Sequence, residues 1–337
     1  MNIRLIGLAI AIVSLSANGA AAQTLKAVKD RGSLTCGVSE GLPGFSAKDD
    51  KNQWSGFDVD FCRALAAAIF NNATKVNFVP LSASDRFDAL RSNKIDVLSR
   101  NSTWTMERET GLGLLFSAIT YYDGQGFMVR RSTNIESALE LADKTVCTQA
   151  GTTTELNAAD YFRNNRLTAQ IKTYPTVDDA LKAYSDRTCD AFTADSSQLH
   201  ALLIKLDTPR NHLILPDIVS KEPLGPVVRQ NDVKWLNIVK WTHFAMVNAE
   251  ELGVGQKNLD EAKQSQKPSV RRLLGLEGNF GTELGLTNDW AVRVIHLVGN
   301  YGEVFERNVG TGSKLAIPRG INSLWDRGGI QYAPPVR

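Results

Sequence analysis

The sequence has few histidines, few cysteines and no clustered charge, and each scarcity argues against a class of protein. The four histidines lie far apart in the chain and away from the four cysteines, so neither type forms the closely spaced set of a metal site. The 38 basic residues nearly balance the 36 acidic ones, and no run of Lys or Arg suggests binding to nucleic acid or a membrane surface. No Ser-His-Asp set or glycine-rich phosphate loop is present. We therefore expect no cofactor and no catalytic or metal-binding residues.

Long apolar runs are also absent beyond the N-terminus. Leu5 to Leu15 is almost wholly apolar and follows the positive charge of Arg4, and 20–22 is an alanine triplet that fits the small-x-small rule of signal peptidase. This run of about eleven residues is shorter than the roughly 20 that a membrane anchor needs. We therefore expect residues 1–22 to be a secretory signal peptide, removed before Gln23, and the rest of the chain to be soluble.

The four cysteines, Cys36, Cys62, Cys147 and Cys189, all follow the expected signal peptide. An even number of cysteines in an exported protein favours disulfide bonds. The spacing of the residues by itself leaves all three pairings open.

Strand and helix patterns alternate along the first part of the chain. Residues 33–38, 76–80 and 95–99 are typical of strands, a helix is expected to begin at Asp58 as its N-cap, and another is expected over 85–92. Strands that alternate with helices predict an α/β fold with a mostly parallel sheet. The 315 residues that follow the signal peptide (337 − 22) are enough for one large domain or two lobes.

A partial internal repeat in the sequence favours two similar lobes. Residues 87–98 and 178–192 both contain a helix pattern followed by a short strand that ends in polar residues. We expect the chain to cross between lobes at 126–129, to begin the second lobe at 145–149, and to return near 222–225.

The C-terminal part has helical periodicity. One amphipathic helix is marked by Trp235, Val239, Thr242 and Met246, and a second by Trp290, Val294, Leu297, Tyr301 and Phe305. The aromatic stripes are interpreted as core. The tail from 317 to 337 is expected to be extended and irregular.

Three polar clusters each follow a predicted strand, where ligands gather in open α/β sheets. The first spans 100–108. Its Arg108 either offers a planar, two-pronged donor to a carboxylate or is a solvated surface arginine, and Thr105 is expected to cap the helix that begins there.

The other two clusters have similar alternatives. In 149–155, a glycine followed by threonines leaves backbone N–H groups open to an anion at a helix start, although Thr152 and Glu155 also fit a capping box. In 190–195, Asp195 suits an ammonium group or the N-cap of the next helix. Together the clusters supply two partners for a carboxylate, the Arg108 cation and the helix start at 152–153. They also supply one partner for an amine, the Asp195 carboxylate. An α-amino acid is the complement of this set, and two closing lobes would desolvate both of its charges together.

With these residues, the chain resembles the polar-amino-acid-binding proteins that serve ABC importers, solute-binding protein family 3. The resemblance covers almost all of the sequence after the signal peptide. It is carried by G-F-D-V-D at 56–60, D-V-L at 96–98 followed by T-x-x-R at 105–108, F-S-x-x-x-Y-Y at 116–122 with Thr120 in place of a proline, G-T-T at 151–153 and D-A-F…D at 190–195. Residues 278–281 and 322–335 are similar to the general L-amino-acid-binding subfamily.

The resemblance implies a role for each candidate residue. The α-carboxylate would be bound by Arg108 and the backbone at Thr152 and Thr153. The α-ammonium would be bound by Asp195, Thr103 and the Asn101 carbonyl. One departure is Leu42, which stands where many members place an aromatic residue against the ligand side chain. Arg100 would either meet an acidic side chain or lie on the rim.

The same resemblance implies a two-lobed periplasmic-binding-protein fold (type II), in which each lobe is a mostly parallel sheet flanked by helices and two crossover strands form the hinge. Residues 23–127 and 226–337 would form lobe 1 with a helical C-terminal extension, and 128–225 would form lobe 2. It further implies the disulfide pairs Cys36–Cys62 and Cys147–Cys189, each within one lobe.

The implied function is the capture of free L-amino acids, polar or acidic and neutral, by a monomeric periplasmic protein that delivers them to the permease subunits of an ABC importer in the inner membrane. A dehydratase-like enzyme on this scaffold is one alternative, but it needs a general acid or base in the cleft. The only candidate, Glu107, has neighbours that suggest an outward-facing position. A sensor subunit of the same fold is the other alternative. We therefore expect a binding protein and not an enzyme.

Overall fold

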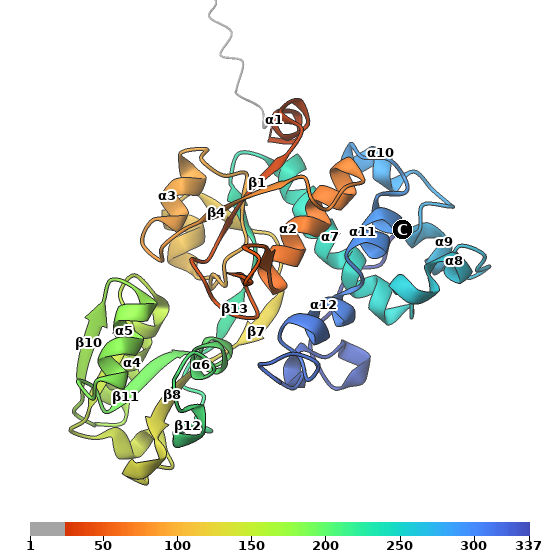
Figure 1. Ribbon diagram of the computed structural model, residues 1–337. Helices are drawn as coiled ribbons and strands as arrows, with labels where there is room; N and C mark the ends of the chain where they lie inside the picture. The colour runs from red at the N-terminus through yellow and green to blue at the C-terminus, as the bar shows by residue number, and fades with distance from the viewer. Residues whose placement is uncertain (1–23) are drawn as a thin grey trace, which may run out of the picture.

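The computed structural model describes residues 24–337, so the expected signal peptide lies outside the described residues. Two lobes, each built on a five-stranded sheet with helices, are joined by a narrow ladder of two strands (Figure 1). This is the predicted α/β, two-lobed fold. Among the described residues, no helix is both long and apolar enough to span a membrane.

The first sheet has the strand order β4-β1-β5-β14-β6. Its strands are β1 (Leu34–Val38), β4 (Val76–Pro80), β5 (Val97–Leu98), β6 (Leu114–Phe116) and β14 (Val227–Arg229). Strand β1 is parallel to β4 and β5, whereas β14 is antiparallel to β5 and β6. The short hairpin β2 (Ala47–Lys48) and β3 (Trp54–Ser55) lies outside this sheet.

The second sheet repeats this arrangement with the order β10-β9-β11-β8-β12. Its strands are β8 (Gln125–Arg130), β9 (Thr145–Gln149), β10 (Gln170–Tyr174), β11 (Ala191–Asp195) and β12 (His212–Ile214). Strand β9 is parallel to β10 and β11, and β8 is antiparallel to β11 and β12. The partial repeat in the sequence corresponds to this similarity, because its two strands, β5 and β11, both occupy the third place in their sheets.

Helices cover both faces of the second sheet. Helices α5 (Val177–Ser185) and α6 (Ser196–Leu203) pack in one apolar cluster, and α4 (Thr153–Asn164) packs in another on the opposite face. Helix α3 (Arg86–Arg91) packs against one face of the first sheet.

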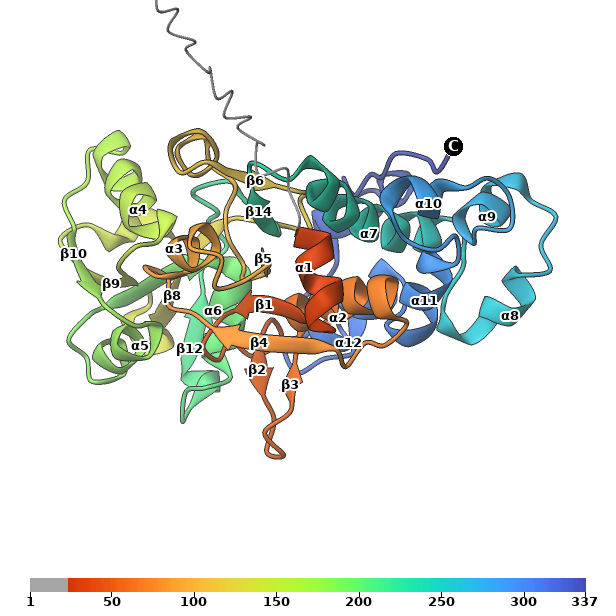
Figure 2. The ribbon, with the colours of Figure 1, turned by 90° about the horizontal axis from the view of Figure 1, so that it is seen from above.

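The largest core lies in the first lobe, where α2 (Phe57–Phe70) and α7 (Val233–Glu251) pack with the C-terminal helices. Figure 2 shows these helices at the end of the lobe that faces away from the second lobe. The expected helix that spanned both Trp290 and Phe305 is in fact two, α11 (Trp290–Leu297) and α12 (Tyr301–Asn308). The break lies at Gly299, which has φ +107°, and at Asn300, whose side chain accepts a hydrogen bond from Glu303 N and so begins α12. The remaining helices are α1 (Thr24–Arg31), α8 (Leu259–Ala262), α9 (Pro268–Leu273) and α10 (Phe280–Leu284).

The chain passes between the lobes on two short antiparallel strands, β7 (Tyr121–Asp123) and β13 (Glu222–Leu224). The return crossing lies where the sequence predicted it. The first crossing lies before the predicted residues 126–129, which belong to β8 of the second sheet. Residues Phe127, Met128 and Val129 are fully buried because helices cover both faces of that sheet.

The C-terminal tail runs along the free edge of β7. The side chain of Asn322 accepts a hydrogen bond from Tyr122 N at 2.7 Å and donates one to Tyr122 O at 2.9 Å, as a neighbouring strand would. The Gln331 amide donates to Thr120 O at 3.2 Å. The tail therefore completes the hydrogen bonding of the first crossing strand on the side away from β13.

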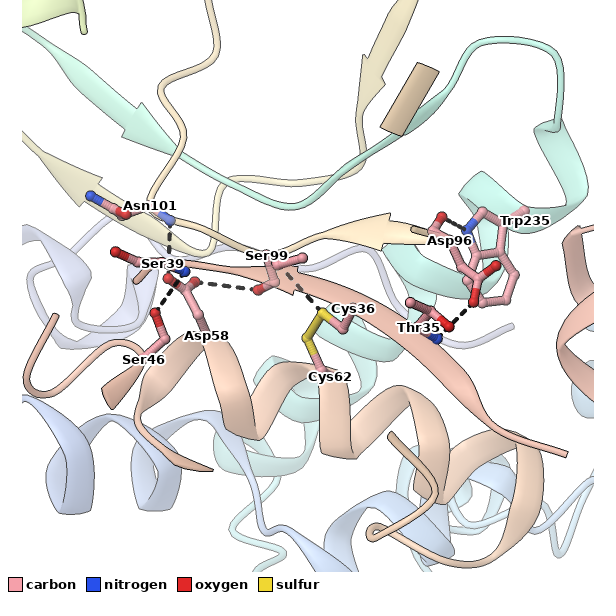
Figure 3. The surroundings of a disulfide bond; sticks show 11 residues. Thr35, Cys36, Ser39, Ser46, Asp58, Cys62, Asp96, Ser99, Asn101 and Trp235 are labelled. Carbon is pink, nitrogen blue, oxygen red and sulfur yellow. Dashed lines mark hydrogen bonds between the residues drawn. A yellow bond between two sulfur atoms is a disulfide. The ribbon is translucent and has the colours of Figure 1, made fainter. Parts of the chain in front are cut away.

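Both predicted disulfides are present. Cys36 on β1 is bonded to Cys62 on α2, with a Cα–Cα distance of 6.3 Å (Figure 3), and Cys147 on β9 is bonded to Cys189, with a Cα–Cα distance of 5.7 Å. Each bond lies within one lobe.

Candidate functional site

A cavity of about 210 Å³ lies between the two lobes. All six residues predicted to bind the ligand line it: Asn101, Thr103 and Arg108 from the first lobe, and Thr152, Thr153 and Asp195 from the second. The volume is below the roughly 300–1,000 Å³ of pockets for drug-sized ligands. The cavity is therefore matched to a small molecule.

Arg108 belongs to a short π-helical turn, η1 (Glu107–Gly111), and is only 8% exposed. Its backbone N–H is held by the hydroxyl of Thr105 at 3.3 Å, so Thr105 has the expected capping role. Its Nη1 donates to Thr103 O at 2.8 Å, and its guanidinium lies over the Phe87 ring with Cζ 5.2 Å from the ring centroid. These contacts hold a rigid, buried cation at the cavity wall, which excludes the solvated surface position considered from the sequence.

The start of α4 faces Arg108 across the cavity. Thr152 is the N-cap residue, but its hydroxyl donates to Gln149 O at 2.7 Å and accepts from no backbone N–H of the first turn. The capping box that the sequence allowed with Glu155 is therefore not formed. The N-terminal N–H groups of α4 have no side-chain cap and are available to an anion in the cavity.

Asp195 ends β11 and points its carboxylate into the same cavity, 5% exposed. It occupies the N-cap position of α6 without making a side-chain capping bond. Asp123 at the hinge takes that role, because its carboxylate accepts from Ser197 N at 3.3 Å. Asp195 is thus left free for a ligand.

The charge state of Asp195 depends on its neighbours. Burial raises the pKa of Asp195 well above its usual value, the nearby Asp123 and Glu222 raise this pKa further, and Arg108 and Arg86 oppose the rise. An ammonium group beside Asp195 would favour the ionised carboxylate, because an opposite charge at close range stabilises the charged form.

The polar loop after β5 is held by Asp58. This residue was predicted to be the N-cap of α2, but Gly56 is the N-cap and Asp58 lies in the first turn. Its carboxylate reaches to the loop and accepts from Asn101 N at 3.0 Å and Ser99 Oγ at 3.3 Å (Figure 3). Burial raises the pKa of Asp58 to about 6. Asn101 is held at φ +26°, and its side-chain Oδ1 is buried without a hydrogen-bond partner.

Two further arginines line the cavity. Arg86 at the start of α3 is 3% exposed, its Nε has no partner, and burial, followed by the charges of Arg100 and Arg108, lowers its pKa well below the usual value. Arg100 is 6% exposed and not a rim residue; its Nε donates to Leu81 O at 2.8 Å. Leu42, at the position of the missing aromatic residue, also lies in the lining.

Sequence reasoning missed Arg86, Asp123 and Glu222. Arg86 follows the predicted strand 76–80 by a few residues, as the three polar clusters follow theirs. This position after a strand was the only signal in the sequence that pointed to Arg86. Nothing local marks Asp123 or Glu222, because the partners that connect them to the ligand-binding elements, such as Ser197 for Asp123 and Thr103 for Glu222, are distant in the chain. Among residues 24–337, no group of three or more His, Cys, Asp or Glu side chains is arranged to hold a metal.

Comparisons with known proteins find similar amino-acid-binding proteins. A general L-amino acid-binding periplasmic protein of Rhizobium johnstonii is 54% identical over 97% of this chain and 96% of its own length. A glutamate/glutamine/aspartate/asparagine-binding protein of Rhodobacter capsulatus is 48% identical over 97% of each.

The fold has a solved counterpart. The structure of an ABC transporter/periplasmic binding protein from Brucella ovis with glutathione bound is 53% identical, covers 93% of this chain and 99% of its own, and has a TM-score of 0.92. The family model of the bacterial extracellular solute-binding proteins, family 3, matches residues 34–256. The resemblance inferred from the motifs is therefore confirmed, and this chain belongs to the bacterial extracellular solute-binding proteins, family 3.

Proposed function

We propose that this protein binds free L-amino acids in the cavity between its lobes and delivers them to the permease of an ABC importer. The observation that carries the proposal is that Arg108, the start of α4 and Asp195 line one cavity between the lobes. These groups match the two opposite charges of a zwitterion. The names of the two amino-acid-binding relatives support the same ligand class.

In the proposed complex, the α-carboxylate lies against Arg108 and the backbone N–H groups at Thr152 and Thr153. The α-ammonium lies against Asp195, Thr103 and the carbonyl of Asn101. Each ligand charge then has a buried partner, which offsets the cost of taking it out of water.

The cavity also favours a second anionic or polar group on the ligand. Arg86 and Arg100 both line it, and only one of the three arginines is assigned to the α-carboxylate. We therefore propose acidic amino acids and their amides among the ligands, with smaller neutral amino acids admitted by the short Leu42 side chain. Glutathione, bound by the relative from Brucella ovis, belongs in any screen because it carries an α-amino acid group and a second carboxylate.

Two lobes on a hinge allow capture by closure. The sequence led to a division into lobe 1 (23–127 and 226–337) and lobe 2 (128–225). We propose the same two lobes, but we place the boundary between them at the β7–β13 ladder, because β8 already pairs in the second sheet. A ligand shifts the population toward the closed form only by binding that form more tightly. Contacts from both lobes to one ligand provide this difference.

Export, assembly and delivery complete the proposal. The periplasmic relative supports a periplasmic location, with residues 1–22 as the cleaved signal peptide. The protein would act as a monomer, and the permease subunits in the inner membrane would recognise its closed, ligand-bound form.

A screen of refolded protein tests the ligand class. Unfolding and refolding removes any ligand retained through purification, after which thermal unfolding is measured with each standard L-amino acid and with glutathione. We expect several amino acids to raise the melting temperature, since a ligand that binds only the folded state stabilises it. A protein stabilised by none of them would contradict the proposal.

A further inference from the structure

Glu222 is the point at which the candidate ligand contacts of both lobes meet. It lies on β13 in the hinge, is 1% exposed and does not line the cavity. Its Oε2 accepts from the hydroxyls of Thr103 at 2.5 Å and Thr153 at 2.9 Å. Its Oε1 accepts from Asn157 Nδ2 and Ser220 Oγ, both at 2.6 Å. Four donors match the roughly four lone-pair sites of an ionised carboxylate.

These four bonds divide into two groups. Thr103 is joined to β13 through the backbone, because Trp104 N donates to Pro223 O at 2.8 Å and Gly225 N donates to Ser102 O at 3.1 Å. Glu222 and Thr103 therefore belong to one unit, and Ser220 precedes Glu222 by only two residues in the chain.

Thr153 and Asn157, in contrast, lie on α4 of the second lobe. Rotation of that lobe about the hinge would separate them from Glu222. The hydrogen bonds from Thr153 and Asn157 to Glu222, which we term the interlobe contacts, therefore belong to the closed arrangement of the lobes.

The bonds also set the polarity of the hydroxyls. Thr103 and Thr153 each use their single hydroxyl proton to reach Oε2, so only the lone pairs of these oxygens remain for the cavity. A hydroxyl in this state accepts hydrogen bonds, as a ligand ammonium group requires.

We propose that Glu222 is a positioning residue that holds the closed form through α4 and presents Thr103 to the ligand as an acceptor. This inference rests on the proposed function, since it assigns the residue to amino-acid capture. It gives a kinetic signature: the interlobe contacts hold the closed form and take no part in the first encounter with the ligand, so their loss accelerates release and leaves association nearly unchanged.

Asn157 and Ser220 provide a matched pair of variants, because each donates one hydrogen bond of the same length to the same oxygen. Asn157 lies on α4, whereas Ser220 lies beside β13 and its Oγ also accepts from Gln125 N at 3.3 Å; neither residue lines the cavity. Association and dissociation rates are measured by stopped-flow fluorescence with L-glutamate, or with the standard amino acid that the wild type binds most tightly. For Asn157→Ala we expect dissociation about tenfold faster and association within about twofold of wild type. For Ser220→Ala both rates should stay within about twofold.

Two further variants separate positioning from a general structural defect. Asn157→Asp places a second carboxylate beside Oε1, so its dissociation should be faster than that of Asn157→Ala because like charges repel. Glu222→Ala removes all four bonds and should release ligand fastest, with thermal unfolding of the ligand-free protein checking its fold. Equal dissociation rates for Asn157→Ala, Ser220→Ala and wild type would overturn the inference while leaving amino-acid binding intact. A wild type that binds no amino acid would instead contradict the proposed function.

Discussion

Replacing Arg108 with alanine tests the assignment of the α-carboxylate. Arg108 is 8% exposed and lines the cavity, so its removal leaves the ligand carboxylate with the start of α4 as its remaining partner. Breaking a buried charge pair from one side costs about 3–5 kcal/mol. Since about 1.4 kcal/mol corresponds to a tenfold change, we expect affinity to fall from about 100-fold to several thousand-fold.

Part of this loss is indirect, because Arg108 also donates to the carbonyl of Thr103. Arg108→Lys separates the two effects: it keeps the positive charge but loses the planar fork, so its affinity should lie between those of wild type and alanine. Arg163→Ala is the control, because this arginine lies on α4 with its side chain 76% exposed.

Isothermal titration calorimetry on refolded protein measures all three variants, and thermal unfolding without ligand checks that each one folds. Near-normal binding by a folded Arg108→Ala would refute the assignment. Equal losses in Arg108→Ala and Arg163→Ala would point to a general electrostatic effect and not to a direct contact.

Three further predictions concern stability. Burial raises the pKa of Asp58 from 3.8 to about 6, so the folded protein binds this proton more tightly than the unfolded chain, and the contribution of Asp58 to stability falls as pH rises from about 4 to about 6. Denaturant unfolding of the ligand-free protein should therefore show a greater loss of stability between pH 4.5 and pH 7 for wild type than for Asp58→Asn, and equal losses would contradict this. Reduction of the two disulfides, which close loops of 26 and 42 residues, should lower the unfolding free energy by about 3–4 kcal/mol each; an unchanged midpoint in urea after complete reduction would exclude it. Asn322→Ala should cost about 2–4 kcal/mol because both main-chain groups of Tyr122 lose their partner, whereas the exposed Asn164→Ala should be nearly neutral in the same measurement.

The role of Asp195 shows how tertiary contacts settle a local ambiguity. From the sequence, its carboxylate suited either an ammonium group or the N-cap of α6. In the structure, Asp123 reaches from the hinge to Ser197 N and takes the capping role. Asp195 remains in the cavity without a capping bond. The choice between the two roles depended on a residue about 70 positions away.

For Asp58, the sequence pattern identified the right helix but not the contact that the side chain makes. The G-F-D pattern led to the right helix, with the N-cap two residues too late at Asp58 instead of Gly56, but to the wrong role for the aspartate. Gly56 at φ +132° turns the chain into α2, so Asp58 falls in the first turn and reaches across to the loop at Asn101. A residue in the first helical turn is free to make such a contact, and the pattern itself does not reveal the partner.

The choice of the six cavity residues came from the family resemblance, but the sequence by itself determined the α/β class, the alternation of strands and helices in the first part of the chain, and the three polar clusters that follow strands. These features depend on periodicity and on the direction of a strand, which are local properties of the chain. Only the tertiary structure decided that Arg86 lines the cavity, that Glu222 binds Thr103 of its lining, and that Asp123 caps the helix after Asp195. It also decided that the tail completes the edge of β7 and where the first crossing lies. The physical reason is that burial and hydrogen bonding of these groups join segments as many as 211 residues apart, and such pairings leave no periodic trace in the chain.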